Sequence, residues 1–178
     1  MNVYKAKFVR YALVRALLHN SLTLCNWMWP MAVSPLKERK YRGDTSLEAQ
    51  FYSLATGIKM SEKELDDAAA KGFTLQRAYT ITQMKAAGIA NPVDLRNGHD
   101  QTNEWVTAQD KAKDGSKIAQ FTPGTIQMEK ADMELGRTMV YREFGWDEKT
   151  GAPTRAGLEA AGMKDIADGL AAKGLLPA

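Results

Sequence analysis

Few residues of this 178-residue chain are of types that perform chemistry by themselves. There is one cysteine, Cys25, and there are two histidines, His19 and His99. No H-x-x-x-H or C-x-x-C spacing, glycine-rich nucleotide loop or G-x-S-x-G motif occurs. The sequence therefore argues against the common zinc, nucleotide-binding and serine-hydrolase sites, and Cys25 remains as the main candidate.

Two interpretations of Cys25 are open from the residues alone. Free cysteines are most often small, buried hydrophobic residues. Cys25, however, lies in an apolar segment, residues 20–35, with two tryptophans and two prolines, beside a basic stretch. Positive potential favours the thiolate, which suits an anionic metal cluster. Because such a cluster ordinarily takes four thiolates, ligation by Cys25 requires partners outside this chain.

The net charge of +3 is distributed unevenly along the chain. Residues 1–37 contain no Asp or Glu, so the remaining 19 basic residues (24 minus 5) face all 21 acidic ones. The five basic residues of this stretch are Lys5, Lys7, Arg10, Arg15 and Lys37. They could serve an anionic ligand, nucleic acid or a membrane surface, or they could simply be solvated.

The composition predicts an ordinary globular protein. Hydrophobic residues make up 44% and charged residues 25%, and the length fits one domain over residues 1–178. A single cysteine excludes an intrachain disulfide and fits a reducing compartment. We find no uncharged run of membrane-spanning length and no signal-peptide pattern, so we expect a cytoplasmic location without a membrane span.

Helical patterns account for most of the chain. Residues 3–19 are apolar on nearly every face, which predicts a helix buried on several sides. Two capping-box patterns, Thr45-x-x-Glu48 and Ser61-x-x-Glu64, predict helix starts. The second helix should end at Gly88, and further helices are expected over 128–144, 155–161 and 165–173. The apolar row expected on the helix at 128–144 is Met128, Ala131, Leu135 and Met139.

Long connections separate these helices. Residues 91–125 lack a regular pattern, and a segment of this length in a small domain is often functional. Its residues Arg96, His99 and Asp100 are candidates for a substrate cavity, with a solvated surface loop as the alternative. Because strand-like alternation is almost absent, we predict an all-α, irregular multi-helix domain with long connecting loops.

Several segments resemble the aldehyde ferredoxin oxidoreductase family. Asn20–Cys25, NSLTLC, resembles its D-x-x-G-L-C motif, with Asn20 in place of the aspartate and Thr23 in place of the glycine. FTLQRAYT at 73–80 is similar to its L-x-R-A-F-N helix, and MVYREFGWDEKTGAPTR at 139–155 to its near-terminal Y-x-x-x-G-W-D-x-x-T-G-x-P-T-R. LEAAGMKDIADGL resembles its closing segment. The LCNWMWPM and NGHD stretches look closest to a bacterial branch of unestablished substrate.

The resemblance implies cofactors and a reaction. Family members hold tungsten or molybdenum in two pterin dithiolenes beside a [4Fe–4S] cluster, and the cysteine of the motif is the last cluster ligand. Cys25 would thus bind the cluster, while Asn20, Thr23 and Leu24 would contribute to cofactor binding. The chain would be the C-terminal part of a larger catalytic subunit that carries the other ligands, and would be inactive alone. The complete enzyme would oxidise an aldehyde-like substrate and pass electrons to a ferredoxin-like carrier or iron–sulfur subunit.

A different class of function fits the charge pattern. The chain could be a non-enzymatic helical module that binds nucleic acid or an acidic protein through its basic N-terminal helix. Such binding would weaken steeply with added salt. The motif resemblance favours the oxidoreductase, for which no nucleic-acid partner is expected.

Overall fold

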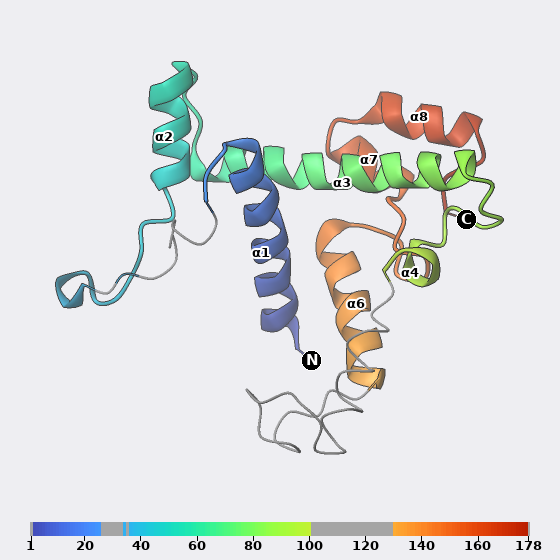
Figure 1. Ribbon diagram of the computed structural model, residues 1–178, viewed down its shortest axis with the longest axis horizontal. Coiled ribbons are helices and arrows are strands. Elements are labelled where there is room, and N and C mark those ends of the chain that lie inside the picture. Colours follow the sequence, from blue (N-terminus) through green and yellow to red (C-terminus); the bar gives the residue numbers. More distant parts are fainter. Residues whose placement is uncertain (1, 26–33, 35, 101–129, 178) are drawn as a thin grey trace. The chain divides into compact units, whose positions relative to one another are not determined.

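The computed structural model describes residues 2–25, 34, 36–100 and 130–177. These residues form seven α-helices and one short 3₁₀ helix, η1 (Lys37–Arg39), and their only strand-like pairing is an isolated bridge between Trp146 and Pro153 (Figure 1). The predicted all-α class is therefore confirmed. No helix in these ranges is long and apolar enough to cross a membrane.

The chain divides into two compact units, which are described separately below. The first comprises residues 8–77, and the second, called here the C-terminal unit, comprises residues 1–7 and 78–178. The boundaries fall inside two long helices, α1 (Val3–Ser21) and α3 (Glu62–Ala86). The prediction that residues 1–178 form one domain stays a prediction.

The 8–77 unit contains most of α1, the helix α2 (Leu47–Thr56) and the first part of α3. Its buried apolar side chains come from all three helices: Val14, Leu18, Ala49, Leu65 and Ala69. A Cβ added to Gly72 of α3 would lie 3.3 Å from Cδ2 of Leu17, so the Leu17 side chain of α1 packs closely over this glycine. Burial of α1 on several sides is not confirmed, since Phe8 is 68% exposed.

The two capping-box predictions have different outcomes. At the start of α3, the Ser61 N–H donates to Glu64 Oε2 (2.8 Å) and the Glu64 N–H donates to Ser61 Oγ (3.3 Å), as predicted. The backbone hydrogen bond from Ser61 lowers the pKa of Glu64. The box at Thr45 is wrong: α2 begins at Leu47 after Ser46, which makes no capping hydrogen bond, and Glu48 is buried instead.

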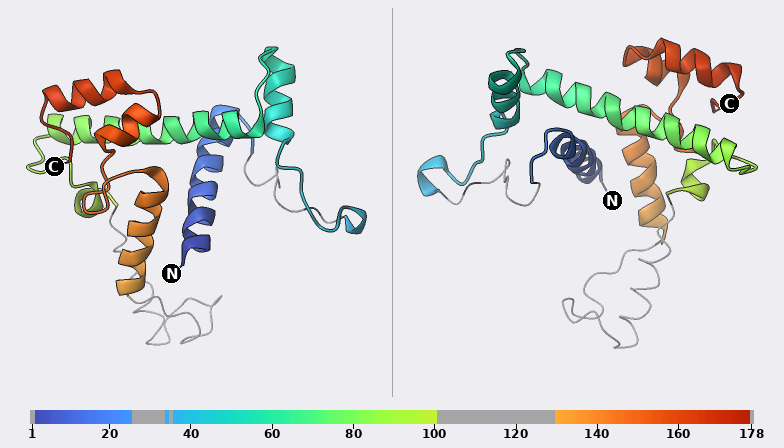
Figure 2. Two further views of the ribbon diagram at one scale, coloured as in Figure 1. Left: turned by 180° about the vertical axis from the view of Figure 1, so that it is seen from behind. Right: turned by 45° about the horizontal axis from the view of Figure 1, so that its top comes forward.

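In the C-terminal unit, the end of α3 is surrounded by four shorter helices. These are α4 (Leu95–Gly98), α6 (Lys130–Phe144), α7 (Arg155–Ala160) and α8 (Lys164–Ala172). Figures 1 and 2 show α8 running along the C-terminal half of α3, with α7 beneath it. The core that joins α3, α4, α7 and α8 consists of Ala78, Ile81, Leu95, Ala152, Leu158, Met163, Ala167, Leu170 and Leu175.

The predicted helices of this unit are confirmed, but the apolar row of α6 is not its buried face. Leu135 is 44% exposed, and Met128 lies outside the described residues. The buried aromatic residue of α6 is Tyr141, and the helix presents a largely polar face to α4. Polar contacts, analysed with the candidate site, hold α6 in place.

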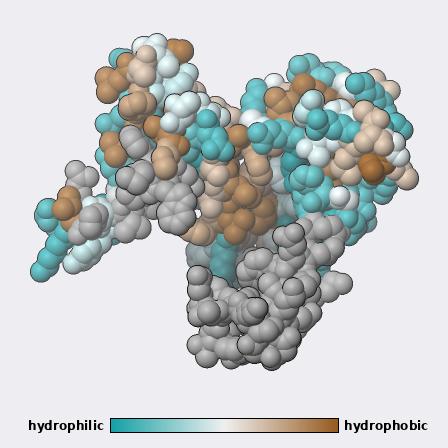
Figure 3. Space-filling model, viewed as in Figure 1, coloured by the Kyte–Doolittle hydropathy of each residue, from teal (hydrophilic) through white to brown (hydrophobic). Residues whose placement is uncertain are grey.

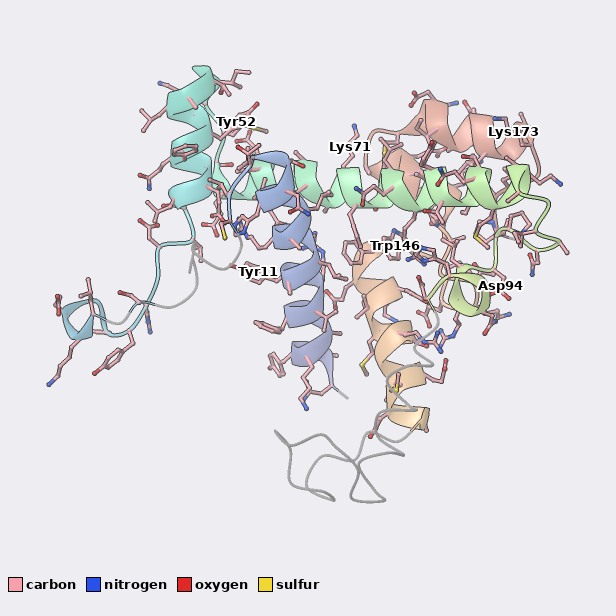
Figure 4. The ribbon with its side chains drawn as sticks, viewed as in Figure 1. Tyr11, Tyr52, Lys71, Asp94, Trp146 and Lys173 are labelled. Carbon is pink, nitrogen blue, oxygen red and sulfur yellow. The ribbon has the colours of Figure 1, made fainter. Side chains whose placement is uncertain are left out.

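A tight turn connects α6 to α7. Gly145 ends α6 with φ +68°, and Trp146 stacks on Phe144 with ring centroids 4.4 Å apart (Figure 4 labels Trp146). On the other side of the turn, a Cβ added to Gly157 would lie 2.7 Å from the carbonyl oxygen of Gly145. The start of α7 can approach the end of α6 this closely only because residue 157 has no side chain.

We predict opposite effects for alanine at two helical glycines of this unit. Gly157→Ala should destabilise the chain by about 1–3 kcal/mol, because the methyl group would overlap a backbone oxygen that cannot move independently. Gly169→Ala, on α8 with nothing within 4 Å of the added Cβ, should stabilise it by up to about 1 kcal/mol. Urea unfolding of both variants measures the difference. Equal stabilities would contradict the close approach at Gly157.

Candidate functional site around Cys25

The residues predicted to bind cofactors lie at the C-terminal end of α1. The Leu24 N–H donates to the His19 carbonyl (2.8 Å), and the Thr23 N–H faces the Asn20 carbonyl (3.4 Å). These two bonds, with Thr23 in the left-handed region at φ 58°, are the geometry of a Schellman motif. The motif turns the chain away from the helix axis immediately before Cys25.

Thr23 occupies the position at which glycine is normally required. The left-handed region costs a non-glycine residue roughly 1–2 kcal/mol, and a β-branched side chain fits it poorly. Glycine is the residue of the related D-x-x-G-L-C motif at this position. The left-handed backbone at Thr23 therefore supports the alignment of Asn20–Cys25 with the motif, although Thr23 replaces the glycine of the motif.

Cys25 is exposed, as are Asn20 and Thr23, while Leu24 is half-buried. The alternative that Cys25 is a buried core residue is therefore wrong. An exposed thiol at the end of a defined turn can reach a group outside the unit. Among the residues that the structure describes, no three His, Cys, Asp or Glu side chains gather as a metal site.

A buried charged cluster lies beneath the end of α1. Nε2 of His19 donates to Oε1 of Glu48 (2.9 Å), and the Arg15 guanidinium lies 3.1 Å from the same oxygen. Glu48 is 0% exposed and His19 is 2% exposed. The guanidinium of Arg15 also lies 5.1 Å from the ring centroid of Tyr11, which Figure 4 labels on α1. Burial of Tyr11 raises the pKa of its phenol.

This cluster and a second ion pair change the interpretation of the acid-free N-terminal stretch. Arg10 pairs with Asp66 at 3.2 Å, and Arg15 pairs with Glu48 and, at 3.8 Å, with Glu62. Two of the five basic residues thus have acidic partners within the 8–77 unit. Their charge stabilises helix packing, which reduces the positive potential expected around Cys25.

Arg96, a predicted cavity residue, connects α4 to α6 and to the following turn by hydrogen bonds. Its guanidinium donates from Nε and Nη2 to Glu134 Oε2 (3.1 and 2.6 Å), and from Nη2 to the Glu134 carbonyl (2.8 Å). Nη1 donates to Thr138 Oγ1 (3.0 Å) and to the Glu148 carbonyl (2.7 Å). Because a guanidinium has five N–H groups, these bonds leave none for a substrate. The hydrogen bond from Arg96 lowers the pKa of Glu134.

The other two predicted cavity residues form a connected pair. Asp100 Oδ1 lies 2.8 Å from His99 Nδ1, and Asp100 Oδ2 accepts the Tyr141 hydroxyl (2.6 Å). Arg137 donates to the carbonyl of Asp100 (2.8 Å). The side chain of His99 is 54% exposed. A carboxylate on Nδ1 fixes the orientation of an imidazole and directs Nε2 outward, as in acid–base and metal-binding histidines.

The structure thus separates the predicted residues into two groups. Asn20, Thr23, Leu24 and Cys25 belong to the 8–77 unit, and Arg96, His99 and Asp100 belong to the C-terminal unit. Residues 26–33 and 101–125, which the sequence also singled out, lie outside the described residues. Sequence reasoning missed Glu48, although its T-x-x-E pattern marked it, because that pattern was assigned to a helix cap.

Comparison with known proteins identifies one family. The family model described as "Aldehyde ferredoxin oxidoreductase, domains 2 & 3" matches residues 1–163. The matched range includes both the turn at Cys25 and the segment that ends α6, and it confirms the resemblance to the family. No solved structure matches the chain.

Replacing Thr23 by glycine should stabilise the chain. Glycine removes the penalty of the left-handed conformation, and part of that gain is offset by the larger freedom of glycine in the unfolded chain. We expect a net increase of about 1 kcal/mol in the free energy of unfolding, measured by urea denaturation. The matched variant Thr23→Ala keeps a Cβ and should not produce this gain. If alanine stabilised as much as glycine, the strain at residue 23 would be excluded.

Proposed function

Because the chain belongs to the aldehyde ferredoxin oxidoreductase family, we propose that it forms a helical part of a larger catalytic subunit and contributes one cluster ligand. The family is one of tungsten- or molybdopterin-dependent enzymes. Residues 1–178 would be the C-terminal domain of that subunit. The cofactor-binding part and the remaining cluster ligands would lie in the rest of the enzyme.

The exposed thiol of Cys25 at the end of the Schellman turn is the observation that carries this proposal. A buried thiol would be inaccessible to a cluster, whereas Cys25 is exposed and follows a turn closed by backbone hydrogen bonds. Thiolate is the usual protein ligand of iron in [4Fe–4S] clusters. Cys25 would thus complete a cluster whose other three ligands belong to another part of the enzyme.

The neighbouring residues fit a contact with a pterin less strongly. Asn20 is exposed and carries an amide, which both donates and accepts hydrogen bonds but has no charge. The hydroxyl of Thr23 donates to the Leu22 carbonyl (2.7 Å), so it is already engaged. We therefore assign pterin contact to Asn20 and a conformational role to Thr23 and Leu24.

In the reaction, the bis-pterin metal would supply two-electron oxidation of an aldehyde or a related oxo substrate. The cluster held by Cys25 would connect that centre to a ferredoxin-like carrier or an iron–sulfur subunit, in the cytoplasm. This chain would fix the ligand and shape its surroundings, since the protein around a cofactor chiefly orients and tunes it. The rival role in nucleic-acid binding loses support because Arg10 and Arg15 are paired with carboxylates.

We further propose that His99 faces the substrate, oriented by Asp100. Asp100 is itself held by Tyr141 and Arg137, so the imidazole is oriented by a supported carboxylate while the His99 side chain is 54% exposed. A histidine in this arrangement can bind a polar group or transfer a proton. Arg96 holds α6, which carries Tyr141 and Arg137, and would not contact the substrate.

The first functional test is Cys25→Ser in the enzyme that contains the cofactor-binding part. Serine is a harder ligand than thiolate, so iron content and the low-temperature paramagnetic signal of the cluster should change. The free energy of unfolding should fall by no more than about 0.5 kcal/mol, because Cys25 is exposed. Electron transfer should slow while helical content is unchanged.

The matched control is Thr23→Ser, in the same turn, which keeps a hydroxyl and leaves the thiol intact. Its iron content and cluster signal should equal those of the parent enzyme. An unaltered cluster in Cys25→Ser would eliminate the proposed ligand.

The second functional test compares His99→Ala with His99→Gln in the same enzyme. If His99 contacts the substrate, alanine should lower kcat/KM for aldehydes by about tenfold or more. Glutamine should restore part of the loss if a hydrogen bond suffices, and none if a proton is transferred. Unchanged turnover of every tested aldehyde in His99→Ala would remove His99 from the substrate site.

A further inference from the structure

We propose that the buried hydrogen bond between His19 and Glu48, supported by Arg15, positions the turn that presents Cys25. This inference rests on the proposed function of Cys25 as a cluster ligand and identifies residues that would act through it. His19 and Glu48 would be positioning residues, since neither contacts the cluster itself.

His19 connects the buried cluster to the turn through two different groups. Its side chain is fixed by Glu48 of α2 through the 2.9 Å hydrogen bond. Its main-chain carbonyl accepts the Leu24 N–H at 2.8 Å. Leu24 is covalently bonded to Cys25. The Glu48 carboxylate is therefore connected to the thiol through the side chain of His19 and one backbone hydrogen bond, from Leu24 to His19. Displacement of the His19 side chain therefore disturbs the turn directly.

The burial of these groups makes the contact rigid. The last turn of a helix usually frays, because its carbonyl groups lack intrahelical partners. Here the side chain of His19, in the last turn of α1, is 2% exposed and is hydrogen-bonded to a carboxylate that is 0% exposed. The remaining oxygen of that carboxylate, Oε2, has no hydrogen-bond partner among the described residues. Oε1 consequently carries the contacts with both His19 and Arg15, and the loss of either leaves a buried charge poorly compensated.

The conformation of Thr23 independently indicates that the turn is held from outside. A non-glycine residue persists in the left-handed region only where its surroundings determine the backbone conformation. At Thr23 the two backbone bonds of the motif start from the helix end that His19 anchors. The strained backbone of Thr23 and the buried side chain of His19 thus both indicate that the turn is held in one conformation. A thiol held in one direction can meet a cluster without the chain first becoming ordered.

The test uses the 178-residue chain without any cofactor. Cys25 is its only cysteine, so a nitroxide label there reports the mobility of this turn alone. The label spectrum and the hydrogen exchange of the Leu24 amide are measured in His19→Leu, His19→Gln and a matched control, Asp66→Asn. Asp66→Asn removes the charge that pairs with Arg10, a residue of α1 that is remote in sequence from the turn.

We expect His19→Leu to increase the exchange rate of the Leu24 amide about tenfold, equivalent to about 1.4 kcal/mol, and to increase label mobility. Glutamine places an amide nitrogen near the position of Nε2, so His19→Gln should restore slow exchange. Asp66→Asn should leave both readouts unchanged, even if it lowers global stability. A purely structural role of His19 would lower stability without this local effect.

The inference is overturned if His19→Leu leaves the label spectrum and the exchange of Leu24 as in the parent chain. It is also overturned if Asp66→Asn changes both as strongly. If circular dichroism shows that His19→Leu does not fold, Glu48→Gln is measured in its place. Its label spectrum and the exchange of the Leu24 amide then decide the outcome. Because no cluster is involved, these results are independent of Cys25→Ser: a cluster unaffected by that substitution would refute the ligand and leave the anchor in place.

Discussion

The fully buried carboxylate of Glu48 constrains the 8–77 unit more than any other group, because a charge removed from water must be compensated by its neighbours. Arg15 and His19 supply that compensation from two successive turns of α1, and so α2 can pack on α1 in essentially one register. Replacing a buried ion pair by apolar residues is often neutral for stability, whereas removing one partner is costly. The cluster is therefore better understood as a device for specificity than as a source of net stability.

The C-terminal unit uses the same principle at another place. Arg96 connects α4 to α6 and to the turn after α6 through a guanidinium whose donors are all engaged. In both units a charged side chain connects neighbouring helices, while several large apolar residues remain on the surface. On α2 these are Leu47, Phe51 and Leu54. Figure 3 shows hydrophobic colour at its upper left, in the region of α2.

Sequence patterns located the helices well because helix starts and ends depend on local chemistry. Ser61 and Glu64 interact across a single turn, and Gly88, with φ +77°, adopts the conformation that ends α3. Sequence patterns failed where a residue interacts with a segment that is distant in sequence. The local sequence around Glu48 is compatible with a capping box, and only the partners on α1, far away in sequence, show that the carboxylate points inward.

The same distinction explains the outcome for the predicted cavity residues. Arg96, His99 and Asp100 looked alike as polar residues in an irregular segment, and nothing in their spacing predicted their partners. Their different roles follow from α6, where Glu134 and Thr138 engage Arg96, and Tyr141 engages Asp100. The apolar row assigned to α6 concealed this, because periodicity reports hydrophobic faces and not polar ones.

The turn at Cys25 shows which parts of a motif are geometric and which are chemical. At the position where the family motif has glycine, Thr23 has a left-handed backbone, which is the conformation that glycine adopts most readily. The position of the aspartate, now Asn20, keeps hydrogen-bonding capacity but loses its charge. Leu24 and Cys25 remain unchanged: one closes the turn by bonding to the carbonyl of His19, and the other presents the thiol. Because the backbone bond of Leu24 starts from an anchored helix end, the direction of the thiol is determined by α2, on which the motif itself contains no residue.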